Sequence, residues 1–335
     1  LSAVAEQCGW DGYQIIQSLT GEHLAQLEYQ HPFCQRTGRF FAGDEFVDNA
    51  TGTGFVHVAP GHGLEDYHLG VRVGLPIYSP VDDDGCFTHT PDLPADQQMP
   101  TDMLGKSILE KHGKSDANET VLHALRVRKA LLHQENYHHS YPHCWRSKTP
   151  IIFRAMDQWF VRIDHAPPDA PAPFRQQALD AIGHVHWVPA WGRTRIEAAV
   201  KGRPDWCISR QRAWGVPIPA FSDSQGNPIL DARIVRRVAD LVARHGSQIW
   251  FEQTAAELWP QVKPADWTGP DPVAKMADTL DVWIDSGSSS RSVLMQRPEL
   301  QQPDSARFPH PWQADLYLEG SDQHRGWFQS SLLLA

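Results

Sequence analysis

The stretch that decides the fold is residues 315–328, which read Asp-Leu-Tyr-Leu-Glu-Gly-Ser-Asp-Gln-His-Arg-Gly-Trp-Phe. The run 316–318, Leu-Tyr-Leu, is short and apolar, as is typical of a buried strand. Gly320 and Ser321 interrupt it, and from Trp327 onward apolar residues recur at helical spacing. The pattern predicts a strand that leads into a helix, which is the repeating unit of an open α/β sheet.

Polar side chains occupy the predicted junction between this strand and helix, namely Glu319, Asp322 and Gln323. In open α/β sheets, ligands bind in the crevice outside the carboxyl ends of the strands. Two carboxylates, an amide and the nearby indole of Trp327 suit a ligand with ribose hydroxyls, an ammonium group and an apolar side chain. The alternative interpretation is a capped helix start with solvated acids, and this stretch by itself leaves both open.

The sequence of this stretch resembles isoleucyl-tRNA synthetases, a family of class I aminoacyl-tRNA synthetases. Three further segments resemble the same family, in the family's order: Gly-Phe-Val-His-Val-Ala-Pro-Gly-His-Gly-Leu-Glu-Asp at 54–66, Trp-Cys-Ile-Ser-Arg-Gln-Arg-Ala-Trp-Gly at 206–215, and Asp-Thr-Leu-Asp-Val-Trp-Ile-Asp-Ser-Gly at 278–287. The resemblance covers essentially all 335 residues and is least distinctive at 220–275.

The resemblance implies an α/β fold in three parts. Residues 1–155 are expected to be a mostly β editing-type domain, and 156–275 connective insertions with helices. Residues 276–335 are expected to form the second half of a Rossmann-type parallel sheet. The residue pattern predicts helices at the following places: around Met103–His112, from Leu64, at Phe174–Ile182, Gly192–Val200, 232–246 and 253–259, and from Trp327.

Composition limits the class of protein. No stretch approaches the roughly 20 apolar residues of a membrane helix, and no signal peptide is evident. Five cysteines without paired spacing favour a reducing compartment, so we expect a cytoplasmic protein. The net charge of −10 argues against a general nucleic-acid coat, although a local basic patch is enough to bind RNA.

The first candidate site is His57 with Asp66. Alternation along 55–59 places His57 on one face of an expected strand, and the turn 60–63 lets Asp66 fold back toward it. A carboxylate beside an imidazole would receive an ammonium group. The alternatives are a buried histidine satisfied by the aspartate and, less favoured because the spacing is wrong, a metal site that adds His62 and His68.

For this first site, the resemblance implies an editing pocket. Asp66 would hold the α-ammonium of a misattached amino acid, and His57 would line the side-chain cavity and keep isoleucine out. Thr51 and Thr53, just upstream, are expected to line the same pocket. One methylene group is worth only about 1–3 kcal/mol in an apolar pocket, and isoleucine against valine in this family is the standard example of that limit. A second, smaller cavity that admits valine supplies the missing selectivity.

The second candidate site is Trp283 with Trp327. Alternation over Leu280–Asp285 predicts a strand with Trp283 on one face, and two indoles would make flat walls for a branched aliphatic side chain. Core packing is the alternative. The resemblance places both indoles around isoleucine, with Glu319, Gly320 and Asp322 on the adenylate ribose and Gln323 on the aminoacyl end. The roles of Asp322 and Gln323 are interchangeable at this stage.

The third candidate site is the segment 206–215, where Arg210, Gln211 and Arg212 offer donors suited to phosphates. The resemblance leaves open whether it contacts the acceptor end of tRNA or acts as a hinge. The implied partners are isoleucine tRNA, isoleucine and ATP, with Mg²⁺ accompanying ATP, and no membrane or obligate protein partner.

Two kinds of motif are missing. Residues 133–147 are rich in His and contain Cys144, but Ser147 stands where some relatives have a second cysteine, so no zinc is expected. The family's ATP signatures, His-Ile-Gly-His and Lys-Met-Ser-Lys-Ser, do not occur. We therefore expect an internal fragment without synthetic activity of its own. A free-standing editing hydrolase and a non-catalytic tRNA-binding paralogue are the alternatives.

Overall fold

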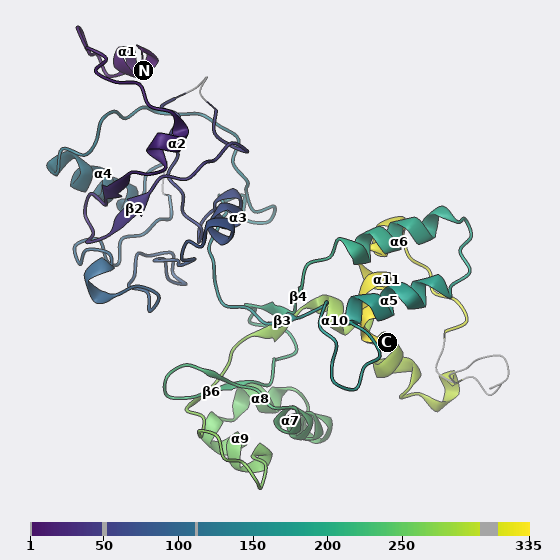
Figure 1. Ribbon diagram of the computed structural model, residues 1–335. Coiled ribbons are helices and arrows are strands. Elements are labelled where there is room, and N and C mark those ends of the chain that lie inside the picture. The colour runs from purple at the N-terminus through teal and green to yellow at the C-terminus, as the bar shows by residue number, and fades with distance from the viewer. Residues whose placement is uncertain (1, 49–51, 111–112, 302–313) are drawn as a thin grey trace. The chain divides into compact units, whose positions relative to one another are not determined.

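The structure is a computed structural model that describes residues 2–48, 52–110, 113–301 and 314–335. It divides into two compact units, Leu1–Asp157 and Gln158–Ala335 (Figure 1). Helices and strands occur in both, which confirms a mixed α and β content. Each unit is described by itself.

The first unit is mostly irregular chain held by turns and short elements. Its helices and strands are α1 (Ser2–Gln7), α2 (Gly21–Leu24), β1 (Glu28–Gln30), β2 (Thr37–Arg39), α3 (Leu64–Val73), the 3₁₀ helix η1 (Ala95–Gln97) and α4 (Asp116–Val127). The strands β1 and β2 pair antiparallel, and the Arg39 guanidinium donates to Glu28 Oε1 at 2.7 Å. Elsewhere in the described part of this unit, strand pairing is limited to isolated bridges. The expectation of a mostly β domain is therefore wrong here, because these segments pair at single residues instead of forming ladders.

Two helices of the first unit test the sequence reasoning directly. The helix predicted from Leu64 is confirmed as α3, which ends at Gly74 in the left-handed conformation (φ 74°). The helix predicted around Met103–His112 is wrong in its described part, where Met103 is buried among turns and Gly105 has φ +72°. The helix begins later, at α4, because Ser115 Oγ accepts a hydrogen bond from the Asn118 N–H and caps it.

The second unit contains more regular structure. Its elements are β3 (Phe160–Val161), α5 (Phe174–Gly183), α6 (Trp191–Lys201), β4 (Trp206–Cys207), β5 (Ser209–Arg210), β6 (Phe221–Ser222), β7 (Pro228–Ile229), α7 (Ala232–His245), α8 (Gln248–Glu252), α9 (Ala255–Val262), β8 (Ala274–Lys275), β9 (Thr279–Leu280), α10 (Val282–Gly287), the π-helical turn η2 (Ser290–Leu294), the 3₁₀ helices η3 (Pro298–Leu300) and η4 (Ser321–His324), and α11 (Trp327–Leu334). The predicted helices in 174–200, 232–259 and 327–334 are confirmed.

Two groups of buried apolar side chains form the cores of this unit. In one, α5 packs on α6, α6 on α11 and α11 on α10, around Ile182, Ile196 and Trp206 (Figure 1). In the other, α7, α8 and α9 lie with the sheet β7-β6-β8, and Phe221 and Trp259 meet edge to face. The first core positions the candidate site, because α10 and α11 carry Trp283 and Trp327.

The predicted parallel sheet does not form among the described residues, where every strand pair is antiparallel. The run 316–318 has exposed side chains and no strand conformation, since no described strand lies beside it. The strand predicted over Leu280–Asp285 ends at Leu280. The side chain of Asp281 accepts a hydrogen bond from the Trp283 N–H and starts α10 instead.

Candidate functional site

Helices α10, η4 and α11 bring Trp283, Gln323 and Trp327 together around Gly326. Trp327 Nε1 donates to the Ser286 carbonyl at 3.0 Å, and its backbone N–H donates to Gln323 Oε1 at 2.9 Å. A Cβ atom at Gly326 would lie 3.1 Å from the Trp283 ring and even closer to Gln323. Only glycine therefore leaves these three side chains in their places.

The Trp327 indole has one face covered. Tyr317 stacks on it with ring centroids 3.5 Å apart and ring planes 10° from parallel. Trp283 is 38% exposed and keeps an open surface. Tyr317 was not predicted as a site residue, although it lies within residues 315–328, between Leu316 and Leu318.

The polar groups beside this cluster lie on η4 and the segment before it. Glu319 is exposed and makes no hydrogen bond or ion pair with any residue that the structure describes. Gln323 Nε2 donates to Asp322 Oδ2 at 3.2 Å, and a Cβ at Gly320 would meet Asp322 Oδ1 at 2.7 Å. The carboxylates of Glu319 and Asp322 thus remain able to accept hydrogen bonds from a ligand's hydroxyl groups.

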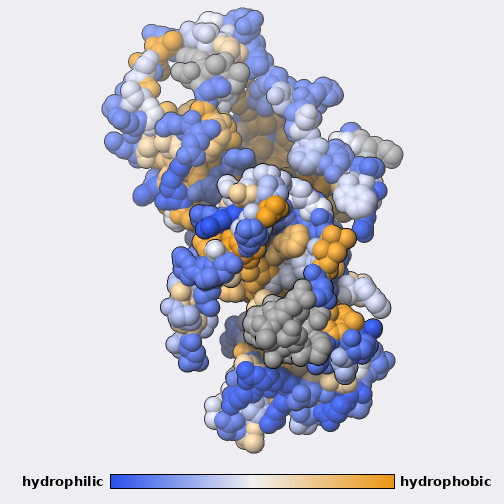
Figure 2. Space-filling model, turned by 90° about the vertical axis from the view of Figure 1, so that its right-hand side faces the viewer, coloured by the Kyte–Doolittle hydropathy of each residue, from blue (hydrophilic) through white to orange (hydrophobic). Residues whose placement is uncertain are grey.

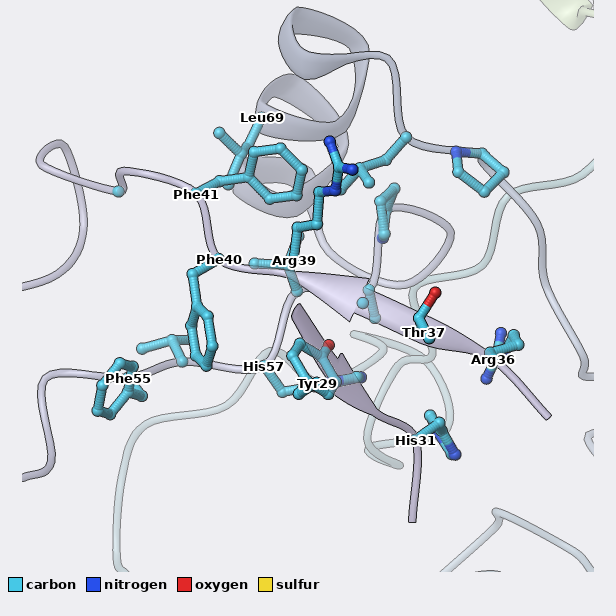
Figure 3. A pocket seen from close by; sticks show the side chains of 18 of the residues that line it. Tyr29, His31, Arg36, Thr37, Arg39, Phe40, Phe41, Phe55, His57 and Leu69 are labelled. Carbon is cyan, nitrogen blue, oxygen red and sulfur yellow. The ribbon is translucent and has the colours of Figure 1, made fainter. Parts of the chain in front are cut away.

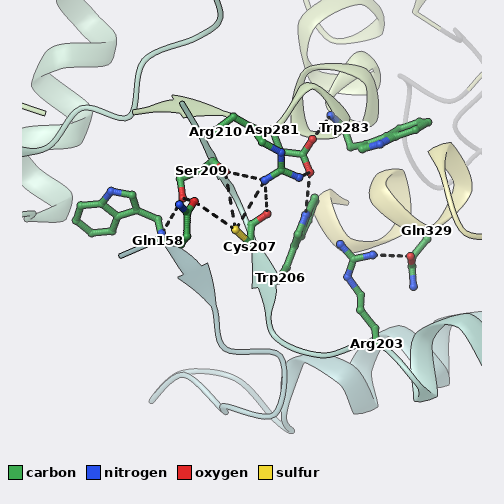
Figure 4. A network of polar contacts seen from close by, with 10 residues as sticks. Gln158, Arg203, Trp206, Cys207, Ser209, Arg210, Asp281, Trp283 and Gln329 are labelled. Carbon is green, nitrogen blue, oxygen red and sulfur yellow. Dashed lines mark hydrogen bonds and ion pairs between the residues drawn. The ribbon is translucent and has the colours of Figure 1, made fainter. Parts of the chain in front are cut away.

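A polar network joins the segment 206–215 to α10 (Figure 4). Asp281 is 4% exposed, and its Oδ2 accepts from Arg210 Nη2 at 2.9 Å and from Trp206 Nε1 at 3.5 Å. Its Oδ1 accepts from the Trp283 N–H at 3.2 Å. Asp281 therefore fixes the start of the helix that carries Trp283, and the sequence reasoning missed it. The signal was an aspartate directly before a helical stretch.

The network changes the role of Arg210. Its Nη1 also donates to the carbonyls of Cys207 and Ser209, so both terminal nitrogens of the guanidinium have partners within the fold. Gln211 Nε2 donates to Asp278 Oδ1 at 3.0 Å. Arg212 is exposed and has no ion pair or hydrogen bond within the described chain, so of the three it is the one left available to a phosphate.

A second buried polar contact holds α11 against α6. Arg203 Nη1 donates to Gln329 Oε1 at 2.6 Å, and Gln329 Nε2 donates to the Ala199 carbonyl at 3.0 Å. Gln329 is 1% exposed, and the Arg203 guanidinium lies 4.9 Å from the centre of the Trp206 ring. Burial lowers the pKa of Arg203, although Asp281 opposes the shift. Nothing in the helical spacing of 327–334 distinguished Gln329 from a surface residue.

The first unit contains a cavity of about 890 Å³ (Figure 3). Its lining is largely apolar and comes from β1, β2, the segments 40–47 and 54–62, α3 and the chain at 75–99; the aromatic and basic residues in it include Tyr29, His31, Arg36, Arg39, Phe40, Phe41, Phe55 and His57. His57 is exposed and lies on irregular chain instead of a strand. The sequence reasoning found His57 but none of the lining residues that precede it.

His31 is a neutral acceptor within this wall. Its Nδ1 accepts from the backbone N–H groups of Phe33 at 3.4 Å and Cys34 at 3.2 Å. Burial lowers the pKa of His31 to about 4, and the positive charge of Arg36 and the proximity of His57 act in the same direction. Protonation of Nδ1 would remove both hydrogen bonds.

The structure does not pair His57 with Asp66. Asp66 does fold back, but its Oδ2 accepts from the Ala59 N–H at 3.0 Å, and Oδ1 has no partner among the described residues. Thr53 Oγ1 bonds the backbone of Phe55, while Thr51 lies outside the described residues. The expected site therefore has its imidazole on irregular chain and its carboxylate in the first turn of α3, without a contact between them.

The two other histidines considered for a metal at this site are not ligands together. His62 Nδ1 bonds the Phe153 carbonyl at 2.9 Å, and its Nε2 lies 3.3 Å from Ser79 Oγ. His68 packs against Tyr67 on α3. Nor does the described chain contain any group of three or more His, Cys, Asp or Glu side chains that would hold a metal ion. In the His-rich segment, hydrogen bonds from Ser147 lower the pKa of Cys144 to about 7.

Comparison with known proteins places the chain in a family. The family model of class I tRNA synthetases (I, L, M and V) matches residues 22–335. The chain therefore belongs to the class I tRNA synthetases of this group. Within the described residues, no helix has both the length and the apolar character needed to cross a membrane.

Several similar curated proteins are isoleucine–tRNA ligases. The isoleucine–tRNA ligase of Syntrophomonas wolfei is 45% identical over 100% of this chain, which covers 33% of that relative. The isoleucine–tRNA ligases of Persephonella marina and Methylococcus capsulatus are 44% and 45% identical over 99% and 98% of the chain, which covers 33% and 31% of them. The chain thus spans about a third of the length of the curated relatives it matches.

Proposed function

We propose that the chain is an internal part of an isoleucine–tRNA ligase, which activates isoleucine with ATP and transfers it to tRNA in the cytoplasm. The observation that carries the proposal is the convergence of Trp283, Trp327 and Gln323 on Gly326, beside the Glu319 carboxylate, which has no partner among the described residues, and the Asp322 carboxylate, which accepts from Gln323. The names of the similar proteins support the choice of isoleucine. In this proposal, residues 276–335 belong to the catalytic domain and 156–275 are connective.

The roles follow from the chemistry of each group. The Trp283 indole, which is open on one side, forms an apolar wall for the isoleucine side chain. Glu319 and Asp322 accept hydrogen bonds from the ribose hydroxyls, and Gly320 permits close approach of the ligand. Gln323, which is already fixed to the Trp327 N–H, is placed at the aminoacyl end. No metal-binding group occurs among the described residues, so we expect Mg²⁺ to arrive with the phosphates of ATP.

In the same proposal, the first unit, up to about residue 155, hydrolyses valyl-tRNA. Asp66 Oδ1, which has no partner in the described chain, receives the α-ammonium of valine, while Oδ2 stays on the Ala59 N–H. His57, in the cavity wall, limits the size of the side chain. Thr51, which lies outside the described residues, remains an expected lining residue, whereas Thr53 does not line this cavity. The partners are tRNA, isoleucine and ATP, with Arg212 on the RNA phosphates, while Gln211 is held by Asp278 and Arg210 holds the loop through Asp281.

A pair of variants of the full-length protein tests this division of labour. Glu319→Ala should lower isoleucine-dependent ATP–pyrophosphate exchange by roughly one to two decades, because a hydrogen bond to a charged group contributes about 1.5–3 kcal/mol. Hydrolysis of pre-formed valyl-tRNA should stay unchanged. Asp66→Ala should give the reverse, with valyl-tRNA accumulating.

A third variant tests the choice of amino acid. Trp283→Ala should raise the KM for isoleucine about tenfold, since an apolar pocket contact is worth about 1–3 kcal/mol. Trp10→Ala, a change at a comparably exposed indole in the first unit, is the matched control. Normal exchange in both Glu319→Ala and Trp283→Ala would refute the proposed site.

A further inference from the structure

The segment 137–145 presents a row of exposed rings that neither proposed site uses. Tyr137 and His139 stack with centroids 5.6 Å apart and planes at 21°, and His139 meets Tyr141 edge to face at 6.0 Å. Alternate residues of extended chain point to the same side, which explains the spacing. Tyr137 is 78% exposed and Tyr141 is 44% exposed. The rings therefore contact one another instead of a core.

The chain after this row folds back on itself and supports it. The Cys144 N–H donates to the Thr149 carbonyl at 2.9 Å, and the Tyr141 hydroxyl donates to the Ile151 carbonyl at 3.0 Å. At the tip of this ribbon Trp145 is 73% exposed, and the Arg146 guanidinium lies 4.8 Å from its ring centre. The aromatic row, which we define as Tyr137, His139, Tyr141 and Trp145, is thus held on a hydrogen-bonded ribbon.

The sequence that contains the aromatic row is basic, in contrast to the chain as a whole. The stretch 126–148 contains five basic side chains and a single acid, Glu135, in a protein with a net charge of −10; the basic residues are Arg126, Arg128, Lys129, Arg146 and Lys148. Isolated apolar residues on a surface are ordinary, and Figure 2 shows several among polar neighbours. Three rings in mutual contact, followed by Trp145 with the Arg146 guanidinium over it, are a different feature, because they offer both stacking faces and a countercharge.

We propose that the aromatic row binds single-stranded RNA, of the kind found at the unpaired acceptor end of a tRNA; the choice of RNA rests on the proposed function. Unpaired bases expose their faces, and aromatic side chains stack on them whatever the base. Arg146, whose guanidinium lies over the Trp145 ring, and Lys148, two residues later in the chain, would supply positive charge for the phosphates of the same strand. His139, one of the histidines that resemble metal ligands in the sequence, acts here as a stacking ring.

The test uses the 335-residue chain and a fluorescein-labelled single-stranded RNA of about eight nucleotides, a length within the usual site size. Tyr137→Ala and Trp145→Ala should each weaken binding about tenfold by fluorescence anisotropy, because stacking contributes about 1–3 kcal/mol per base. Tyr137→Phe keeps the ring and should bind as the unchanged chain does. Phe251→Ala, at an exposed ring of the second unit, is a second control. Arg146→Gln should reduce the slope of log affinity against log salt by about 0.7.

A measurement on the unchanged chain covers the case in which a variant fails to fold. Ultraviolet crosslinking of the same RNA followed by mass spectrometry should place crosslinks within residues 137–145. Crosslinks confined to other segments, or equal binding by the two alanine variants, would overturn the inference. Isoleucine-dependent pyrophosphate exchange by the full-length protein does not involve the aromatic row. Its absence, with RNA binding intact, would therefore count against the proposed function alone.

Discussion

Replacing Asp281 by alanine removes three interactions at once in the second unit. The helix α10 loses its cap on the Trp283 N–H, the Arg210 guanidinium loses its carboxylate, and the buried Trp206 indole loses its acceptor. Because Asp281 is 4% exposed, water does not replace these partners without rearrangement. The perturbation is therefore larger than that of an ordinary surface aspartate.

The magnitude follows from the three contacts. A lost cap costs about 1 kcal/mol. The Arg210 side chain is 41% exposed and keeps two carbonyl partners, so the lost ion pair costs no more than about 1 kcal/mol. The Trp206 contact is long at 3.5 Å, and its loss adds about 1 kcal/mol. A total of about 3 kcal/mol corresponds to roughly 6–12 °C in melting temperature for a unit of this size.

Differential scanning calorimetry of the 335-residue chain measures this change in the transition of the second unit. Asp281→Asn is the second variant to measure, because asparagine caps helices as well as aspartate does. Its free energy of unfolding should fall by only about 1 kcal/mol, because the cap remains and the charge of the carboxylate is lost. Asp240→Ala, at an exposed position on α7, should stay within about 0.5 kcal/mol of the unchanged chain. An Asp281→Ala variant that melts like Asp240→Ala would refute the reasoning.

Three further predictions concern His31, Gly61 and Gly326. Folding lowers the pKa of His31 from its ordinary value of 6.5 to about 4. Between these pH values the unfolded chain therefore binds more protons than the folded chain. The contribution of His31 to the free energy of unfolding is then present above pH 6.5 and lost toward pH 4. After discounting for partial exposure, this loss is about 1–2 kcal/mol in the free energy of unfolding. Urea unfolding should show that the free energy of unfolding falls less between pH 7 and pH 4.5 for His31→Asn than for the unchanged chain. Gly61→Ala would place a Cβ 2.0 Å from the Tyr78 carbonyl oxygen and should cost about 1–3 kcal/mol or more, as a fall in the urea midpoint; an unchanged midpoint would contradict this close approach. In the full-length protein, Gly326→Ala should displace Gln323 and Trp283 and raise the KM for isoleucine, measured by pyrophosphate exchange. Its stability should change little, because the atom nearest to the new Cβ is the end of the flexible Gln323 side chain.

The aromatic walls of the first unit show where sequence reasoning stopped. His57 was found because it belongs to a distinctive segment, but Tyr29, Phe40 and Arg39 come from a separate hairpin. Their convergence on one cavity depends on how β1 and β2 lie against the segment 54–62. No local spacing contains that information, because it arises from contacts between residues far apart in the chain.

Arg210 shows the same limit in the second unit. As a residue type beside Gln211 and Arg212 it was interpreted as a phosphate contact. The fold places it 2.9 Å from Asp281, which lies 71 residues further along the chain. A guanidinium binds whichever acceptor is nearest, so its role is determined by the tertiary neighbour and not by the sequence around it.

The sequence by itself determined the family, the mixed α and β content and the helices α3, α5, α6, α7, α9 and α11. These depend on local sequence motifs, on the 3.6-residue period and on the start and stop signals of helices. Such features are recognised in one segment without knowledge of the segments that pack against it. Tertiary structure decided which segments become strands and which polar side chains form hydrogen bonds or ion pairs inside the protein. The run 316–318 has the composition of a strand, yet it pairs with no described strand. A strand needs a neighbour for its backbone hydrogen bonds, whereas a helix satisfies most of its own.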